Sequence, residues 1–272
     1  LCERSFDAAL IFTSFSQTPH TAGYVCYLAG IPLRAGESKE FGGAALTTEL
    51  RGAPDNLHQA ERNLRLVEAL GFVSDDRQLE VQIPDGVRAA TTFILRDAGI
   101  DPDEPFVLIH PGASATARRY PAERFAAVAS LLLADGLQVL ITGSDRERTL
   151  LDPMRTLALG ARFVVGGTSV PEYAAIVERA ALVVCNDSLP MHLADALRTP
   201  MIVLFSGTDL ESQWEPRVAP ARLLRHETSC SPCYRFDCPI GLPCLDFTPE
   251  AVAGHVLRML HEPAAVLQGA RS

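Results

Sequence analysis

The sequence lacks the features of a membrane-spanning protein and of a general nucleic-acid binder. No uninterrupted apolar stretch reaches the roughly 18 residues of a transmembrane helix, because polar residues at helical spacing interrupt runs such as AAVASLLLA. The chain has one lysine, Lys39, and a net charge of −9, whereas nucleic-acid readers usually carry a basic stripe. We expect a globular protein whose anion sites are local, built from arginine side chains and backbone amides.

Three common active-site signatures are also missing. The sequence holds no G-x-x-x-x-G-K-[ST], which disfavours a P-loop NTPase, and no G-x-G-x-x-G opens a helix after a strand, which disfavours a dinucleotide oxidoreductase. A G-x-S-x-G turn is absent as well, so a hydrolase of the α/β-hydrolase type is not expected.

The N-terminal end lacks a methionine and the basic segment of a signal peptide. The opening LCERSFDAALIF leads directly into a predicted strand. We therefore expect the natural N-terminus to lie upstream of Leu1, and the protein to be cytoplasmic with its cysteines reduced.

What the sequence does contain is a regular alternation of apolar runs and amphipathic segments from residue 105 onward, which is typical of βα units around a parallel sheet. Strands are predicted at FVLIH (106 to 110), LQVLIT (137 to 142), RFVV (162 to 165), LVVCN (182 to 186) and MIVLF (201 to 205). Helices are predicted between them at 121 to 134, 145 to 158, 170 to 180 and 188 to 197, where apolar residues recur at spacings of three and four residues. Right-handed crossovers would place these helices on both faces of one doubly wound sheet.

The part before residue 101 is less regular. Strands are predicted at 6 to 12 and 31 to 36, helices at 19 to 30 and 56 to 70, and a glycine-rich loop at EFGGAALTTEL (40 to 50). The segment from 81 to 105 has proline near both ends and one helix between, which favours a linker. The sequence thus predicts an incomplete N-terminal α/β domain with a linker over 1–100 and a Rossmann-like domain over 101–272.

Every predicted strand of the second domain is followed by a small, hydroxyl-bearing or glycine-bearing turn. Because ligands of open parallel sheets bind beyond the carboxyl ends of the strands, such turns favour a phosphorylated ligand at this edge. The alternative is that glycine and serine serve only as turn and capping residues. The five turns are His110 to Ser114, Thr142-Gly143-Ser144, Gly166-Gly167-Thr168, Asn186-Asp187-Ser188 and Ser206-Gly207-Thr208.

Two stretches are the most specific. In CNDSLPMHLADALRTP (185 to 200), Asp187 or Ser188 can cap the following helix, and His192 in its first turn can donate a hydrogen bond to an anion or can simply pack. In HPGASATARRYPAERF (110 to 125), Arg118 and Arg119 can pair with phosphate oxygens or remain solvated on the surface.

Together, HPGAS with RRYPAERF, LQVLITG followed by Glu147, the segment NDS-x-PMHLADAL-x-TP and the closing cysteines resemble glycosyltransferase family 9, the heptosyltransferases of lipopolysaccharide core assembly. The resemblance runs from about Phe6 to the C-terminal helix. It implies a GT-B architecture of two Rossmann-like domains, in which the C-terminal domain holds the nucleotide-sugar donor. It further implies an inverting, metal-independent transfer without a cofactor.

The resemblance assigns roles to individual residues of this sequence. Ser114 and Arg118 match the loop that faces the diphosphate, and Glu147, four residues after Gly143, matches the acidic residue at the donor ribose. Asp187, Ser188 and His192, which follow Asn186, match the segment that holds the transferred sugar and the diphosphate. The donor-binding residues are thus expected to be Ser114, Arg118, Gly143, Glu147, Asn186, Asp187, Ser188 and His192. The family usually has glycine in place of Leu189, and a side chain there would crowd the phosphates.

By the same resemblance, the general base is expected upstream of Leu1, so no catalytic residue is assigned. The predicted function is transfer of a sugar, a heptose by resemblance, from an ADP-linked donor to a lipid-linked, lipopolysaccharide-type acceptor at the inner face of the membrane, with no nucleic-acid partner. The alternative is a catalytically incomplete nucleotide-sugar-binding module. A sugar-nucleotide epimerase of related fold would require acidic residues at the donor cleft that the sequence does not identify.

Four of the seven cysteines, Cys230, Cys233, Cys238 and Cys244, fall within fifteen residues. Four thiolates in one loop can surround Zn²⁺, but the second pair is not a C-x2-C knuckle and three prolines lie between the cysteines. Relatives in the family carry similar cysteines, which favours a structural role as disulfides or free thiols, and no metal is expected.

Overall fold

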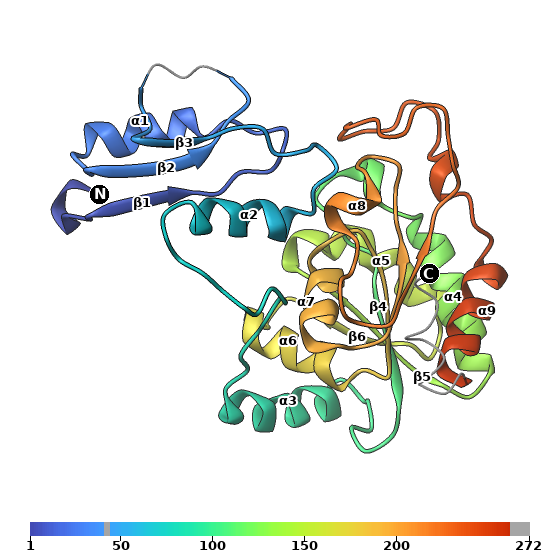
Figure 1. Cartoon of the computed structure of the whole chain (residues 1–272). Coiled ribbons are helices and arrows are strands. Elements are labelled where there is room, and N and C mark those ends of the chain that lie inside the picture. Colours follow the sequence, from blue (N-terminus) through green and yellow to red (C-terminus); the bar gives the residue numbers. More distant parts are fainter. Residues whose placement is uncertain (41–43, 262–272) are drawn as a thin grey trace. The chain divides into compact units, whose positions relative to one another are not determined.

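The computed structural model describes residues 1–40 and 44–261 and divides into two compact units (Figure 1). Unit 1 comprises Leu1–Arg77 together with Glu211–Glu215, and unit 2 comprises Gln78–Leu210 together with Pro216–Ser272. The sequence places the boundary at residue 100, whereas the chain passes from one unit to the other between Arg77 and Gln78.

Unit 1 is a small parallel α/β unit. Its sheet has the order β1 (Ala8–Ile11), β2 (Leu33–Glu37) and β3 (Thr48–Leu50), and both strand pairs are parallel. The helices of Leu1–Arg77 are α1 (His20–Leu28) and α2 (Gln59–Glu68), after a short 3-10 turn η1 (Cys2–Arg4), and α8 (Glu211–Trp214) also belongs to this unit. The predicted loop over 40 to 50 is wrong at its end, where β3 forms, and residues 41–43 lie outside the described part of the chain.

Unit 2 is built on a parallel sheet of six strands in the order β6-β5-β4-β7-β8-β9. All five predicted strands of this sheet are confirmed, and β9, which was not predicted, adds an edge strand beside β8. The strands are β4 (Phe106–His110), β5 (Gln138–Gly143), β6 (Arg162–Val165), β7 (Leu182–Asn186), β8 (Met201–Leu204) and β9 (Ala221–Leu224).

The helices between these strands begin and end close to the predicted positions. They are α4 (Ala122–Ala134), α5 (Arg148–Leu157), α6 (Val170–Arg179) and α7 (Leu189–Leu197), preceded by α3 (Asp85–Asp97) and followed by α9 (Pro249–His261). Short 3-10 turns are η2 (Thr116–Arg118), η3 (Asp145–Glu147) and η4 (Pro243–Leu245). Over the residues that the structure describes, no helix combines the length and the hydrophobicity needed to cross a bilayer.

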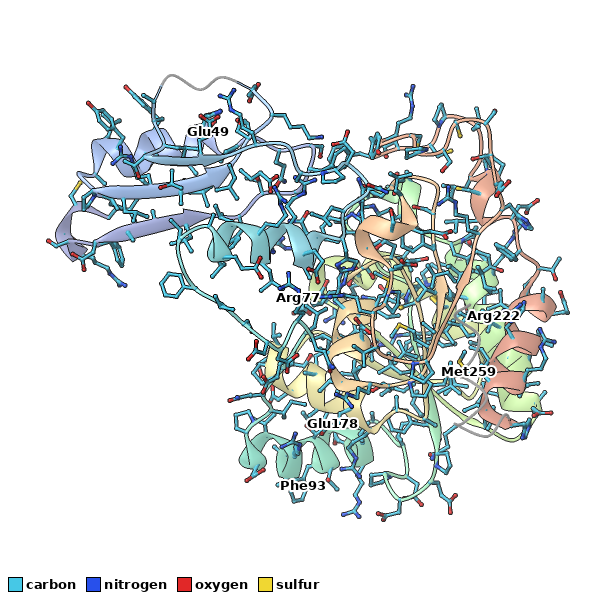
Figure 2. All side chains as sticks on the ribbon, in the orientation of Figure 1. Glu49, Arg77, Phe93, Glu178, Arg222 and Met259 are labelled. Atoms are coloured by element: carbon cyan, nitrogen blue, oxygen red, sulfur yellow. The ribbon has the colours of Figure 1, made fainter. Side chains whose placement is uncertain are left out.

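The segment expected to act as a linker is part of unit 2. Figure 1 shows α3 beside α6, and Leu95 and Thr91 of α3 are buried. Arg88 donates from Nε and Nη2 to the two carboxylate oxygens of Glu178 on α6, at 2.8 and 2.9 Å. Phe93, in contrast, points away from the rest of unit 2 and is 71% exposed (Figure 2). Helix α3 therefore packs through its buried face against α6 of unit 2.

The core of unit 2 lies between the sheet and the layer of α4, α5 and α9. Phe125, Val128 and Leu132 of α4 are fully buried, as are Val107 and Ile109 of β4. Fully burying one such side chain contributes roughly 1.5 to 3 kcal/mol. This core makes the central strands a rigid support for the loops at their carboxyl ends.

The strand order changes direction between β4 and β7, since the chain first adds β5 and β6 on one side and then returns to add β7, β8 and β9 on the other. In sheets of this kind, ligands bind at the carboxyl ends of the strands on either side of this switch point. The loop after His110 and the segment that begins at Asn186 meet there.

Candidate functional site

Asn186 joins the two segments at the switch point. Its side chain is fully buried, its Nδ2 donates to the Pro111 carbonyl at 2.8 Å, and its Oδ1 accepts from the Tyr120 amide at 2.9 Å. Both polar groups of this predicted donor-binding side chain thus bond to backbone. Asn186 therefore fixes the shape of the loop from 111 to 120.

Asp187 is the next residue, and its carboxylate is the most unusual group of the site. The residue is 2% exposed, and its Oδ2 is buried with no hydrogen-bond partner among the described residues. Burial raises the pKa of Asp187 to about 6, against a lowering by Arg118 and a further raising by Asp209. Because buried polar atoms are nearly always paired, an unpaired carboxylate oxygen here indicates a position for an external donor group.

Helix α7 begins directly after this carboxylate without a side-chain cap. The predicted cap by Ser188 is not observed, because its hydroxyl donates to the Gly112 carbonyl at 3.2 Å and to the Asn186 carbonyl at 3.4 Å. Pro190 at the start of the helix has no amide hydrogen to satisfy. The positive end of the helix dipole therefore faces a position without a protein anion in capping contact.

Two further predicted residues lie near this helix start. His192 lies in the first turn of α7 and is half-buried. Leu189, the departure from the family pattern, is 53% exposed, so its side chain points outward to a large extent.

Arg118 is held by an aspartate that the sequence did not identify. Its Nη2 donates to Asp209 Oδ2 at 2.6 Å, and its Nε donates to Thr208 Oγ1 at 3.1 Å. Thr208 Oγ1 in turn lies 2.8 Å from the same Asp209 oxygen and 2.9 Å from Ser206 Oγ. The guanidinium is thus fixed from one side while 28% of the Arg118 side chain stays exposed.

The loop that carries Cys230 to Cys244 contacts both the turn that holds Arg118 and the turn that holds Thr208. The Ala117 amide donates to the Phe236 carbonyl at 2.9 Å, and the Thr116 hydroxyl contacts the Phe236 carbonyl and the Asp237 carboxylate. On the other side, the Cys233 amide donates to the Gly207 carbonyl at 3.0 Å and the Tyr234 amide to the Thr208 carbonyl at 2.8 Å. The backbone of this loop therefore ties the Arg118 turn to the Thr208 turn.

The cysteine side chains form no disulfide bond in the described part of the chain. All seven cysteines lie in the described part of the chain, and each is a free thiol. Within residues 1–40 and 44–261, no group of three or more His, Cys, Asp or Glu side chains is placed to hold a metal ion. The link between the Arg118 turn and the Thr208 turn rests on backbone hydrogen bonds.

Glu147 lies at the carboxyl end of β5, next to the loop after β4. Its Oε2 accepts from the amide and the hydroxyl of Ser144, each at 2.8 Å. A Cβ atom on Gly112 would lie 1.8 Å from Glu147 Oε1, and one on Gly143 would lie 2.4 Å from Leu151 Cδ1. Gly112 therefore packs closely against this carboxylate, whereas a side chain on Gly143 would displace the end of the Leu151 side chain. Ser114 of the same loop is exposed.

The described site thus offers three chemically different surfaces within one sheet edge. Arg118 and the start of α7 suit a diphosphate, the Glu147 carboxylate suits hydroxyl donors, and the buried Asp187 carboxylate suits a sugar hydroxyl. The pairing of Arg118 with Asp209 reduces the local positive charge, so an anion has to share the guanidinium with this carboxylate.

Comparison with solved structures places the fold in a class. The chain superposes on Escherichia coli ADP-heptose lipopolysaccharide heptosyltransferase II with a TM-score of 0.74 and 21% identity, over 95% of this chain and 78% of that one. It superposes on a family 9 glycosyltransferase of Veillonella parvula DSM 2008 with a TM-score of 0.72 and 21% identity, over 86% and 70%. The architecture is that of a GT-B type α/β protein.

The sequence relationship is more specific. The family model of glycosyltransferase family 9 (heptosyltransferase) matches residues 1–242, and the chain belongs to this family. Lipopolysaccharide heptosyltransferase 3 of Escherichia coli is 30% identical over 162 residues, which cover 57% of this chain and 46% of that protein. Lipopolysaccharide heptosyltransferase 2 of strain K12 is 24% identical over 282 residues, which cover 97% and 78%. The chain thus spans about half the length of the first of these relatives.

Proposed function

We propose that unit 2 is the donor-binding half of a heptosyltransferase and that it binds an ADP-linked sugar at the carboxyl ends of β4 and β7. The observation that carries this proposal is the buried, unpaired Oδ2 of Asp187 beside the uncapped start of α7. Family membership supports the class of reaction, and the solved E. coli heptosyltransferase WaaC with ADP, which has the same fold, supports the choice of nucleotide.

In the proposed reaction, the acceptor hydroxyl loses its proton to a base, and its oxygen attacks the anomeric carbon with inversion. The bond from the anomeric carbon to the diphosphate breaks, and ADP leaves with the electron pair. Arg118 and the start of α7 stabilise the charge that develops on the leaving diphosphate. Asp187 accepts a hydrogen bond from a sugar hydroxyl, and Glu147 accepts from the ribose. We assign the general base to no residue of this chain.

The acceptor in this proposal is a lipid-linked saccharide of the lipopolysaccharide type, reached from the cytoplasmic face of the membrane. The names of the E. coli relatives support this class of acceptor. The proposal requires no metal and no cofactor, because the leaving group is stabilised by Arg118 and by the helix end.

Calorimetric titration with ADP, UDP, GDP and ADP-heptose tests the donor site. We expect ADP to bind, and ADP-heptose to bind more tightly because Asp187 contacts the sugar. Asp187→Ala should weaken ADP-heptose at least tenfold and ADP much less, since one hydrogen bond to a buried charged group contributes about 1.5 to 3 kcal/mol.

The matched control is Asp152→Ala, which removes a carboxylate with 58% side-chain exposure on α5 and should leave both affinities unchanged. Absence of binding by every nucleotide would reject the donor site. Equal losses for ADP and ADP-heptose in Asp187→Ala would reject the contact between Asp187 and the sugar.

A further inference from the structure

A cluster of three side chains lies behind Glu147 at the ends of β4 and β5. His110 Nδ1 lies 3.1 Å from Thr142 Oγ1 and 3.1 Å from the Tyr173 hydroxyl of α6. The two hydroxyl oxygens are 3.3 Å apart, and the His110 and Tyr173 rings pack with centroids 5.7 Å apart. The proposed reaction as described above does not use this cluster.

The other ring nitrogen of His110 faces the carboxylate. Its Nε2 lies 3.8 Å from Glu147 Oε2, and the His110 side chain is 12% exposed. Burial lowers the pKa of His110 to about 4, although the charge of Glu147 raises it, so the ring is neutral at neutral pH. A neutral imidazole carries one N–H, and a carboxylate oxygen can only accept, so the hydrogen belongs on Nε2.

The remaining nitrogen, Nδ1, then has to accept a hydrogen bond. The two hydroxyls that face it, those of Tyr173 and Thr142, can each donate. Burial also raises the pKa of Tyr173, so that its hydroxyl keeps its proton. The two hydroxyls are therefore compatible with the tautomer of His110 that directs its N–H at Glu147, and they hold the ring in that orientation.

The two carboxylate oxygens of Glu147 have different surroundings. Oε2 accepts hydrogen bonds from the Ser144 amide and the Ser144 hydroxyl, and His110 Nε2 lies 3.8 Å from it, close enough for an electrostatic contact but too far for a hydrogen bond. Oε1 lies against the backbone of Gly112, and it accepts no hydrogen bond from any residue of the described ranges. One oxygen is thus anchored by the protein, and the other is presented at the loop after β4.

We propose that His110, oriented by Tyr173 and Thr142, is a positioning residue that fixes the Glu147 carboxylate so that Oε1 accepts hydrogen bonds from the two ribose hydroxyls of the bound nucleotide. This inference rests on the proposed function, because it requires the nucleotide ribose to lie at Glu147. It adds a specificity device, since the site then selects nucleotides by their ribose hydroxyls.

Two substitutions of His110 separate positioning from general damage. In His110→Gln, the amide nitrogen falls near the original Nε2 and keeps an N–H directed at Glu147. In His110→Asn, it falls near the original Nδ1 and cannot reach. The measured quantity is the ratio of the Kd of 2′,3′-dideoxy-ADP to the Kd of ADP, determined by calorimetry for each protein.

We expect a ratio of at least ten for the unmodified protein and for His110→Gln, and a ratio below about three for His110→Asn. The affinity for 2′,3′-dideoxy-ADP should be unchanged in both variants, because that ligand does not use Glu147. Tyr173→Phe should fall between them, since Thr142 still donates to Nδ1.

Other outcomes would contradict the positioning role of His110, the ribose position or the donor site separately. A ratio in His110→Asn equal to that of the unmodified protein would overturn the positioning role while leaving the donor site intact. A ratio near one in the unmodified protein would place the ribose elsewhere and overturn the inference, whereas failure of ADP to bind at all would overturn the proposed function as well. A loss of dideoxynucleotide affinity in both variants would show that His110 only supports the fold.

Discussion

At the scale of single residues, Asp187 combines an energetic cost with a proposed use. A carboxylate with an unpaired buried oxygen weakens the folded protein, yet it provides a strong acceptor for a ligand hydroxyl. Binding sites commonly hold such groups because the ligand supplies the missing hydrogen bond. Stability and binding should therefore respond to substitution of Asp187 in opposite directions.

Asp187→Asn should stabilise the unliganded protein at pH 7.5 and weaken ADP-heptose binding. The folded pKa of Asp187, about 6, is above its ordinary value of 3.8, so the carboxylate destabilises the fold fully above pH 6 and not at all below 3.8. The pKa difference corresponds to about 3 kcal/mol as an upper limit.

Urea unfolding of both proteins at pH 7.5, 6 and 5 measures this difference. The advantage of Asp187→Asn should shrink as the pH falls. Titration of His110, whose folded pKa is lowered, affects both proteins equally and cancels in the comparison. A pH-independent difference in the free energy of unfolding, or a variant that is less stable at pH 7.5, would contradict the raised pKa of Asp187.

The sequence singled out loop residues of the candidate site but not their partners. Asp187, Arg118 and Glu147 follow strands or belong to motifs, and the structure brings them to one sheet edge. Asp209 was missed although it follows the strand end at SGTD, because its partner Arg118 lies 91 residues earlier. Tyr173 was missed for another reason: on a helix rich in apolar residues, its sequence context is the same as that of a core tyrosine.

At the scale of elements, the loop after β4 depends on the absence of one side chain. An added Cβ on Gly112 would overlap Glu147 Oε1, at the place where the β4 loop packs against η3. The carboxylate carbon would lie 2.4 Å from this Cβ, so the whole carboxylate has to move and strain its two hydrogen bonds from Ser144.

Gly112→Ala should therefore displace Glu147, lower ADP affinity about tenfold or more, and destabilise unit 2 by roughly 1 to 3 kcal/mol. The control is Gly86→Ala near the start of α3, where an added Cβ meets no atom within 4 Å. Because alanine favours helix more than glycine does, this control should be neutral or stabilising by up to about 1 kcal/mol. Equal behaviour of the two variants, measured by urea unfolding and calorimetry, would contradict the packing argument.

The regular elements were predictable where one physical signal dominated. The strands β4 and β7 agree with their predicted bounds because the runs FVLIH and LVVCN are buried on both faces and end at proline or a polar turn. The edge strand β6 also agrees, although none of its residues is fully buried, because its apolar run RFVV ends at two glycines. The strand β9 was missed because ARLL alternates with an exposed arginine at the sheet edge. The strand β3 has three residues, too few for a period to be recognised.

At the scale of the whole molecule, the two units differ in the size of their cores. Among residues 1–40 and 44–77 of unit 1, the buried hydrophobic residues are Ile31, Ala35, Leu46 and Leu66, whereas unit 2 holds most of those described. Unit 1 also exposes large apolar side chains such as Phe6, Phe12, Tyr24, Tyr27 and Phe72. Since buried apolar area is the main stabilising contribution, unit 1 should be the weaker unit.

We therefore expect thermal unfolding in two transitions, with the lower one assigned to unit 1. ADP should raise the temperature of the upper transition alone, because a ligand stabilises the unit that binds it. Scanning calorimetry with and without ADP measures both effects. A single transition that ADP shifts as a whole, or a shift of the lower transition, would contradict this division.

The most direct test of the donor site is a crystal structure of the chain with ADP bound. We expect the diphosphate within hydrogen-bond distance of Arg118 and the start of α7, and the ribose at Glu147. An ordered ADP molecule elsewhere on the protein, with Arg118 still bound only to Asp209 and Thr208 and with α7 untouched, would contradict this expectation.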